Sequence, residues 1–284
     1  MRSFNDYFFQ TADGLRLYAR DYPSPDINAP VLLCLHGLTR NSRDFESLAL
    51  ALASDFRVVV PEQRGRGLSD YSENASRYSL LQYVEDTRGI IVDLGLERLS
   101  VVGTSMGGLM TFALAAQYPG LIERAVINDI GPEIAQEGLD RIKSYVGVAG
   151  PFKHWDEATA YLRSITAEIF PDWSNAQWSY FARQCYIERE GQIVIDYDRR
   201  IATPLATQSS DTEAETLWSL FEAMVSVPSL LIRGELTDLL APGCVVRMKR
   251  MHPTMEVLNV PNVGHAPMLN EPGVTEAIRR FLLD

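Results

Sequence analysis

The chain has 284 residues, 46% of them hydrophobic and 22% charged, which is ordinary for a soluble globular protein. This length is enough to bury one large core and leaves room for an inserted subdomain. The formal net charge of −11 argues against nucleic acid or an anionic membrane as the main partner, so the sequence predicts neither.

The sequence predicts a cytoplasmic protein. Met1–Gln10 is aromatic and polar, without the apolar region of a signal peptide, and no run approaches transmembrane length. The cysteines Cys34, Cys185 and Cys244 are odd in number and far apart, which favours a reducing compartment over a disulfide framework. Because no Cys-x-x-Cys pair exists and the four histidines are widely spaced, no metal site and no cofactor are predicted. The oligomeric state stays open.

Taken in order, the chain begins with a predicted hairpin and continues as an α/β alternation. Strand-like runs at Tyr7–Gln10 and Leu15–Asp21 flank Thr11–Gly14, whose Asp-Gly pair is typical of a tight turn. Continuous apolar runs then predict strands buried on both faces of a parallel sheet: Val31–Leu35, Arg57–Val60, Leu99–Gly103, Ala125–Ile130, Ser229–Arg233 and Met255–Val260. Helical spacing predicts helices at Phe45–Leu52, Tyr83–Leu94, Leu109–Gln117, Val245–Met251 and Thr275–Leu283. This rhythm predicts an α/β fold with a mostly parallel, doubly wound sheet.

The most informative stretch is Ser100–Gly108, where a strand ends in Gly103-Thr104-Ser105-Met106-Gly107 and a helix follows at once. Backbone from the strand and the helix must pass close together in such a turn, and a Cβ at either glycine would clash. The turn is expected to present Ser105 at its tip, beside a helix N-terminus, where a hydroxyl is suited to nucleophilic attack. The motif alone is weak evidence, so its meaning depends on partners elsewhere in the chain.

The α/β rhythm breaks after Gly131-Pro132, and residues 131–225 are predicted to form a mainly helical insertion. All four tryptophans, Trp155, Trp173, Trp178 and Trp218, lie there, as do six further aromatic residues: Phe152, Tyr161, Phe170, Tyr180, Phe181 and Tyr186. These aromatics could form an apolar lid, but most of them are expected to fill the small core of the insertion itself. The predicted domains are therefore a core of 1–130 and 226–284 and a cap of 131–225.

A Gly- and Arg-rich loop, Glu62–Asp70, follows the second buried strand. A nucleotide-phosphate site would need a Walker pattern, which is absent. The loop is therefore predicted to be structural.

Four polar groups are expected at one edge of the sheet, because the carboxyl ends of parallel strands meet there. Ser105, Asp129, Asp238 and His265 each follow a predicted strand. A serine hydroxyl needs a base to take its proton, and a histidine base needs an acceptor on its other ring nitrogen to fix the tautomer. Such a set is harder to obtain by chance than the Gly-x-Ser-x-Gly turn alone.

With these residues the chain resembles the α/β-hydrolase-fold serine hydrolases that carry a helical cap. The resemblance covers essentially the whole chain and includes His36-Gly37, Gly103–Gly108, the Gly234–Asp238 turn and Gly264-His265 in the family's order Ser, Asp, His. It implies Ser105 as the nucleophile and His265 as general base and later general acid. His36, His252 and His154 do not match the base position. Arg66 stands where related proteins often carry His, outside the triad.

The acid is a choice between two aspartates. Asp238 follows the penultimate strand, where most of the family places the acid, and is favoured. Asp129 is the alternative, because some relatives carry the acid at the end of the strand that follows the nucleophile. If Asp129 is not the acid, its expected role is to cap the turn before Gly131-Pro132. Glu235 lies on the strand side of its turn and is expected to be structural.

The resemblance implies an oxyanion hole made of the backbone N–H groups of Leu38 and Met106. The expected activity is cleavage of a small ester or lactone through an acyl-enzyme on Ser105, with a small, partly apolar carbonyl compound as substrate. Serine as the nucleophile argues against the dehalogenase and epoxide-hydrolase branches.

Other activities stay open, because fold and triad do not fix the substrate. C–C bond hydrolysis of the meta-cleavage type, acyl transfer to another acceptor, and perhydrolysis would use the same triad. A non-catalytic ligand receptor is the remaining alternative, and an intact triad argues against it.

Overall fold

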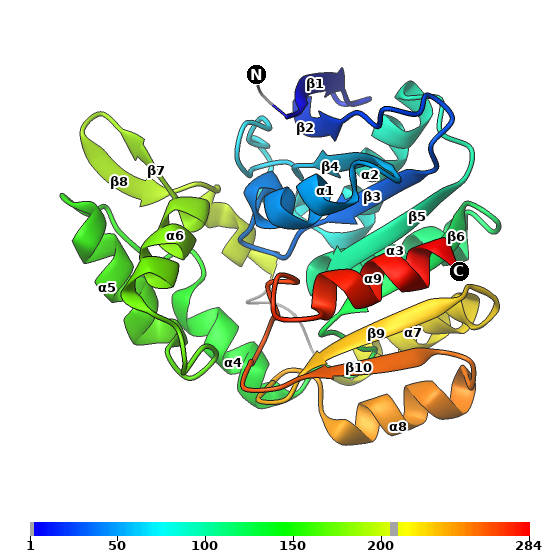
Figure 1. Cartoon of the computed structure of the whole chain (residues 1–284). Coiled ribbons are helices and arrows are strands. Elements are labelled where there is room, and N and C mark those ends of the chain that lie inside the picture. The colour runs from blue at the N-terminus through cyan, green and yellow to red at the C-terminus, as the bar shows by residue number, and fades with distance from the viewer. Residues whose placement is uncertain (1–2, 205–209) are drawn as a thin grey trace.

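The computed structural model describes residues 3–204 and 210–284. Residues 1, 2 and 205–209, which fall inside the predicted core and cap ranges, lie outside the described residues. Figure 1 shows a sheet with helices on both faces and, beside one end of its strands, a separate group of helices with a small hairpin.

The central sheet has eight strands in the order β1-β2-β4-β3-β5-β6-β9-β10. Their bounds are β1 Asn5–Gln10, β2 Arg16–Tyr22, β3 Val31–Leu35, β4 Arg57–Pro61, β5 Leu99–Thr104, β6 Ile122–Asn128, β9 Ser229–Gly234 and β10 Glu256–Val260. The β1–β2 hairpin at one edge pairs antiparallel, as does β2 with β4, and all remaining neighbours pair parallel. The predicted hairpin and all six predicted strands are confirmed, but β10 is an edge strand with mostly exposed residues and is not buried on both faces as predicted. The fold is the expected α/β-hydrolase architecture.

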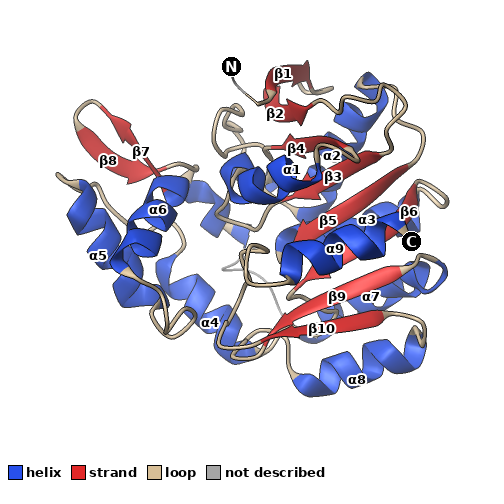
Figure 2. Cartoon of the chain, in the orientation of Figure 1, coloured by secondary structure: helices blue, strands red, loops and turns tan. Residues whose placement is uncertain are grey.

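Helices cover both faces of this sheet (Figure 2). The core helices are α1 Glu46–Leu52, α2 Leu80–Asp93, α3 Met106–Gln117, α7 Ser210–Glu222, α8 Pro242–Met251 and α9 Val274–Leu283. α1 and α9 lie together on one face, whereas α2, α3 and α7 lie side by side on the other. Short 3-10 helices occur at Ser42–Phe45, Ala75–Arg77, Arg199–Ala202 and Ala223–Ser226. The five helices predicted for the core are confirmed, each within a few residues of its predicted ends.

The segment between β6 and β9 contains the insertion. It includes α4 Gln136–Tyr145, α5 Trp155–Thr166, α6 Asn175–Cys185 and an antiparallel hairpin of β7 Tyr186–Arg189 and β8 Gln192–Ile195. α7 also falls in the predicted cap range, but its Phe221 packs edge-on against Phe112 of α3, with ring centroids 5.3 Å apart. We infer that the cap consists of α4, α5, α6 and the β7–β8 hairpin, and that α7 belongs to the core.

Candidate active site

The turn between β5 and α3 holds Ser105 in a strained backbone conformation. Its φ of +52° and ψ of −115° lie outside the regions that L-residues prefer, and its N–H donates to the carbonyl of Asn128 at 3.0 Å. The predicted need for glycine is confirmed. A Cβ on Gly103 would lie 2.4 Å from the carbonyl oxygen of Gly107, and one on Gly107 would lie 2.0 Å from that of Leu35. The close approach of strand and helix therefore presents the Ser105 hydroxyl at the sheet edge.

His265 lies in the loop after β10, and its ring joins two of the predicted residues. Its Nε2 is 2.8 Å from Ser105 Oγ, and its Nδ1 is 2.9 Å from Asp129 Oδ2. A carboxylate can only accept, so Nδ1 carries the proton and Nε2 is left to accept from the serine hydroxyl. The ring is thus held in the tautomer that allows a base to take the serine proton.

The carboxylate at His265 is Asp129, and not the favoured Asp238. Asp129 directly follows β6, is fully buried, and has a φ of +56°. Its N–H donates to Ile232 O at 2.8 Å, and its Oδ1 accepts the N–H of Gly234 at 2.9 Å, so backbone bonds to β9 fix both its main chain and its side chain. In the sheet, β6 lies directly beside β5, so Asp129 follows the strand next to the one that leads into Ser105.

Asp238 instead anchors the cap. Its carboxylate accepts two hydrogen bonds from Arg141 of α4, at 2.5 and 2.8 Å. Burial raises the pKa of Asp238, but the hydrogen bonds and charge of Arg141 outweigh it, so the pKa lies below its usual value. The Gly138 N–H also donates to the Asp238 carbonyl at 3.1 Å. Arg141 was not singled out in the sequence, because it lies almost one hundred residues before its partner.

The other candidate residues near the site have structural contacts. His36 is buried; its Nδ1 lies 2.7 Å from the Gly37 carbonyl and its Nε2 accepts the Gln63 N–H at 3.0 Å. Burial lowers the pKa of His36 to about 3, so it is neutral. His252 Nε2 contacts the Val227 carbonyl at 2.9 Å, and Glu235 accepts the N–H of Asn262 at 3.0 Å. The remaining histidine, His154, precedes α5 in the cap.

Arg66 connects the two residues predicted to form the oxyanion hole. Its guanidinium is fully buried; Nε donates to the Leu38 carbonyl at 2.9 Å, and Nη2 lies 4.0 Å from Met106 Sδ. Nη1 donates to the Arg64 carbonyl and to the Tyr83 hydroxyl, both at 2.8 Å. No sequence motif assigns Arg66 a role, yet this side chain holds the backbone of the loop that carries Leu38.

The rest of the Gly- and Arg-rich loop is held by hydrogen bonds within the loop and to neighbouring elements, which agrees with its predicted structural role. Buried Glu62 accepts the hydroxyl of Ser42 at 2.6 Å and the N–H of Leu68 at 2.6 Å. Arg64 donates to Asp86 through Nε and Nη2, at 2.6 and 2.7 Å. These bonds fix the path of the loop and so the position of Arg66.

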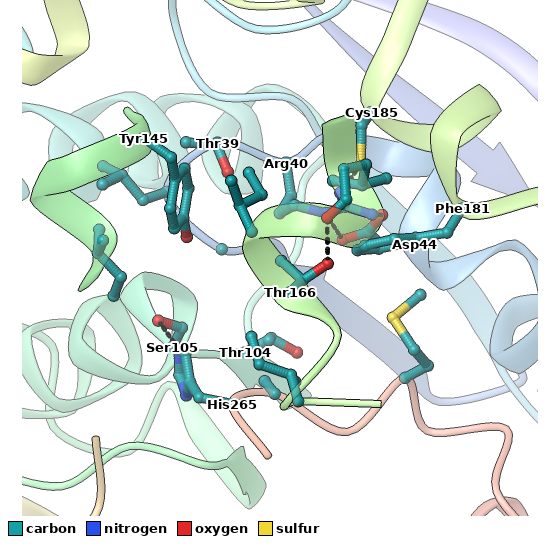
Figure 3. Close-up of a pocket in the computed structure, with 18 of the residues that line it drawn as sticks. Thr39, Arg40, Asp44, Thr104, Ser105, Tyr145, Thr166, Phe181, Cys185 and His265 are labelled. Carbon is teal, nitrogen blue, oxygen red and sulfur yellow. Dashed lines mark hydrogen bonds and ion pairs between the residues drawn. The ribbon is translucent and has the colours of Figure 1, made fainter. Parts of the chain in front are cut away.

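A pocket opens over Ser105 and His265 and is roofed by the cap. It encloses about 1090 Å³ of empty space, its mouth included. Most of the lining is aliphatic or aromatic: Leu38, Ile142, Leu162, Ile165, Ile169, Phe170, Phe181, Tyr186, Ile195, Met268 and Leu269. Figure 3 shows Ser105 and His265 together, with Tyr145, Thr39 and Thr166 around the space above them. The cavity suits a small, partly apolar ligand.

Most cap aromatics pack against one another, as predicted. Trp173 stacks on Phe170 at 3.7 Å between ring centroids and meets Trp178 edge-on at 5.0 Å. No tryptophan lines the pocket described above, whereas Phe170, Phe181 and Tyr186 do. Trp218 lies on α7 and contacts Phe221 of the core rather than the cap.

Within residues 3–204 and 210–284, no three His, Cys, Asp or Glu side chains gather as a metal site. The same residues include no helix both long and apolar enough to cross a membrane. The three cysteines are buried and free.

Residues 30–272 match the family model of the alpha/beta hydrolase fold. The chain therefore belongs to the α/β-hydrolase family, and it is a hydrolase.

Named relatives agree with this assignment. The chain is 36% identical to a 3-hydroxybutyrate-oligomer hydrolase of Cupriavidus necator over 86% of this chain and 85% of that protein. It is 30% identical to a 2-(acetamidomethylene)succinate hydrolase of Mesorhizobium japonicum over 90% of this chain and 88% of the relative. An alpha/beta hydrolase of Novosphingobium aromaticivorans has a solved structure that superposes with a TM-score of 0.93 at 41% identity, covering 100% of this chain and 99% of that one.

Proposed function

We propose that this hydrolase cleaves small esters through an acyl-enzyme on Ser105, with His265 as general base and Asp129 as the residue that orients His265. The observation that carries the proposal is the continuous chain of hydrogen bonds from Ser105 Oγ to His265 Nε2, at 2.8 Å, and from His265 Nδ1 to Asp129 Oδ2, at 2.9 Å. Nucleophile, base and orienting acid in hydrogen-bond contact form the arrangement that activates a serine hydroxyl.

The reaction proceeds in two halves. Ser105 Oγ attacks the carbonyl carbon of the substrate as the hydroxyl proton passes to His265 Nε2. The oxyanion that forms accepts hydrogen bonds from the backbone N–H groups of Leu38 and Met106. His265 then protonates the departing alcohol, which leaves the acyl group on Ser105. In the second half His265 takes a proton from water, the resulting hydroxide attacks the acyl carbon, and the acid is released as Ser105 regains its proton.

Asp129 is suited to orient His265 because hydrogen bonds to β9 restrain both its main chain and its carboxylate. The Gly234 N–H holds one carboxylate oxygen at 2.9 Å, which leaves the other to face His265. The same two contacts keep the carboxylate hydrogen-bonded although it is fully buried, and such bonds offset the cost of burying a charge.

A small ester with an apolar portion is the substrate class that the pocket favours, since its lining is mostly aliphatic and aromatic. The named activity of the Cupriavidus relative, hydrolysis of 3-hydroxybutyrate oligomers, supports an ester substrate, because ester bonds join the units of such oligomers. A lactone fits the same chemistry.

The test is a substrate panel of p-nitrophenyl acetate, a 3-hydroxybutyrate dimer, a simple lactone and a C–C cleavage substrate, with Ser105→Ala as the blank. Added alcohol and added peroxide separate hydrolysis from acyl transfer and perhydrolysis. We expect turnover of the esters that disappears in Ser105→Ala. Ester turnover near the wild-type rate in Ser105→Ala, or cleavage of the C–C substrate alone, would contradict the proposal.

A further inference from the structure

One ion pair, Arg40–Asp44, lies in the wall of the mostly apolar pocket. Figure 3 shows Arg40, Asp44, Phe181 and Cys185 gathered on one side of the cavity, away from Ser105 and His265. All of them line the pocket. A ligand that extends from Ser105 across the cavity reaches this group.

Asp44 occupies two of the three guanidinium nitrogens of Arg40. Nε donates to one carboxylate oxygen at 2.7 Å and Nη2 donates to the other at 2.5 Å, a bidentate pair in which each side chain is 14% exposed. The guanidinium carbon lies 4.4 Å from the centre of the Phe181 ring. Asp44 therefore both fixes Arg40 and neutralises its charge.

The third nitrogen has a poor partner. Nη1 of Arg40 contacts Sγ of Cys185. Burial raises the pKa of the Cys185 thiol, so this sulfur is protonated at neutral pH. A protonated thiol is one of the weakest acceptors among side chains. Nη1 therefore gains free energy if an oxygen atom replaces the sulfur.

We propose that Arg40 Nη1 binds a neutral oxygen, a hydroxyl or an ester carbonyl, at the end of the substrate remote from the cleaved bond. The inference rests on the ester hydrolysis proposed above and defines its substrate class as esters in which a hydrocarbon segment separates the cleaved bond from a second, oxygen-bearing end. A neutral oxygen is favoured over a carboxylate because Asp44 already balances Arg40. A second carboxylate would place an uncompensated negative charge in an enclosed site.

The proposal is tested with two matched ester series, one varied in the acyl chain and one in the alcohol chain. In each, the remote end is a methyl, a hydroxyl or a carboxylate, and the readout is the ratio of kcat/KM between ends. We expect about a tenfold preference for hydroxyl over methyl in one series, expressed mainly in KM, and no further gain for carboxylate.

Three variants test the assignment to Arg40. Arg40→Gln combined with Asp44→Asn replaces the ion pair by neutral amides, and the hydroxyl-to-methyl ratio should fall to within twofold of one. Cys185→Ser gives Nη1 a stronger acceptor that the substrate must displace, so the ratio should fall. Cys185→Ala removes the competitor, so the ratio should rise. A merely structural role of Cys185 would change both substrates alike in each variant, and the two cysteine variants leave the Arg40–Asp44 pair in place should the double variant fail to fold.

Equal rates for methyl and hydroxyl ends in both series, a carboxylate preference, or a ratio unchanged in the double variant would each overturn the inference. Turnover of p-nitrophenyl acetate separates this failure from that of the proposed function. If the acetate is hydrolysed in a Ser105-dependent way but the remote group has no effect, only the role of Arg40 is wrong. If no ester is hydrolysed, the proposed function fails and this inference falls with it.

Discussion

Replacing Asp129 by Asn should abolish most of the activity while leaving the fold intact. Asp129 Oδ1 accepts the N–H of Gly234 at 2.9 Å, so the single oxygen of an Asn side chain will take that bond. The amide NH₂ then faces His265 Nδ1, where Asp129 Oδ2 lies 2.9 Å away in the wild type. A donor facing Nδ1 moves the ring proton to Nε2, and the ring can no longer accept the proton of Ser105.

Loss of the correct tautomer of a triad histidine costs on the order of 10⁴ in kcat, which corresponds to about 5 kcal/mol of activation free energy. We therefore expect Asp129→Asn to lower the acylation rate by roughly 10³ to 10⁴, measured as the pre-steady-state release of p-nitrophenol. The melting temperature and circular dichroism of the variant report whether the fold is retained.

Asp238→Asn is the matched control, since both aspartates follow neighbouring strands of one sheet. Its ion pair with Arg141 joins side chains that are 21% and 20% exposed, and an Asn oxygen still accepts from the guanidinium. We expect a stability loss of about 1 kcal/mol or less and an acylation rate within about threefold of wild type. A larger rate loss in Asp238→Asn than in Asp129→Asn would refute the assignment of the acid.

Three further predictions concern the surroundings of the triad. Gly107→Ala should destabilise the fold by at least about 3 kcal/mol in urea denaturation, because its Cβ would lie 2.0 Å from the Leu35 carbonyl; Gly243→Ala in α8, with nothing within 4 Å, should be neutral or slightly stabilising. Arg66→Lys should lower kcat about tenfold with little change in KM, because a lysine amine cannot hold the Leu38 carbonyl in the same geometry. An unchanged kcat would exclude a positioning role for Arg66. Burial lowers the pKa of His36 to about 3, so between about pH 6.5 and pH 3 the unfolded chain binds a proton at this residue that the folded chain does not. The free energy of unfolding should therefore fall as the pH drops through this range, by up to about 1.4 kcal/mol per pH unit. The slope should be shallower in His36→Gln.

Much of the core was predictable because its signals are local. Val31–Leu35 and Leu99–Gly103 are continuous apolar runs, and each forms a strand buried on both faces of the sheet. The Ser105 turn was predictable for a similar reason, because only glycine tolerates the backbone approach at Gly103 and Gly107. Such features depend on a few adjacent residues and need no knowledge of what lies across the sheet.

The choice between Asp129 and Asp238 could not be made in this way. Both follow buried strands, and only the three-dimensional structure shows that Asp129 is the one in contact with His265. Asp238 is occupied by Arg141, which lies on a cap helix whose docking no local pattern reveals. Contacts between residues far apart in the sequence place Asp129 beside His265 and Arg141 beside Asp238, whereas the family preference favoured Asp238 as the acid.

The cap is mainly helical, as expected, but it also contains a short hairpin that the sequence pattern did not predict. The β7–β8 hairpin turns at Glu190-Gly191, where both residues have positive φ. A Glu-Gly pair is a weaker turn signal than Asn-Gly or Asp-Gly. The strands β7 and β8 have only four residues each, which is too short for a clear alternating pattern in the sequence.

The most direct test of the mechanism is the covalent intermediate itself. The protein is mixed with a p-nitrophenyl ester, quenched in acid during turnover, digested and examined by mass spectrometry. The account predicts the acyl mass on the peptide that contains Ser105, at Ser105, and no acylated peptide in Ser105→Ala. Acylation of another residue, or continued ester turnover by Ser105→Ala at the wild-type rate, would contradict it.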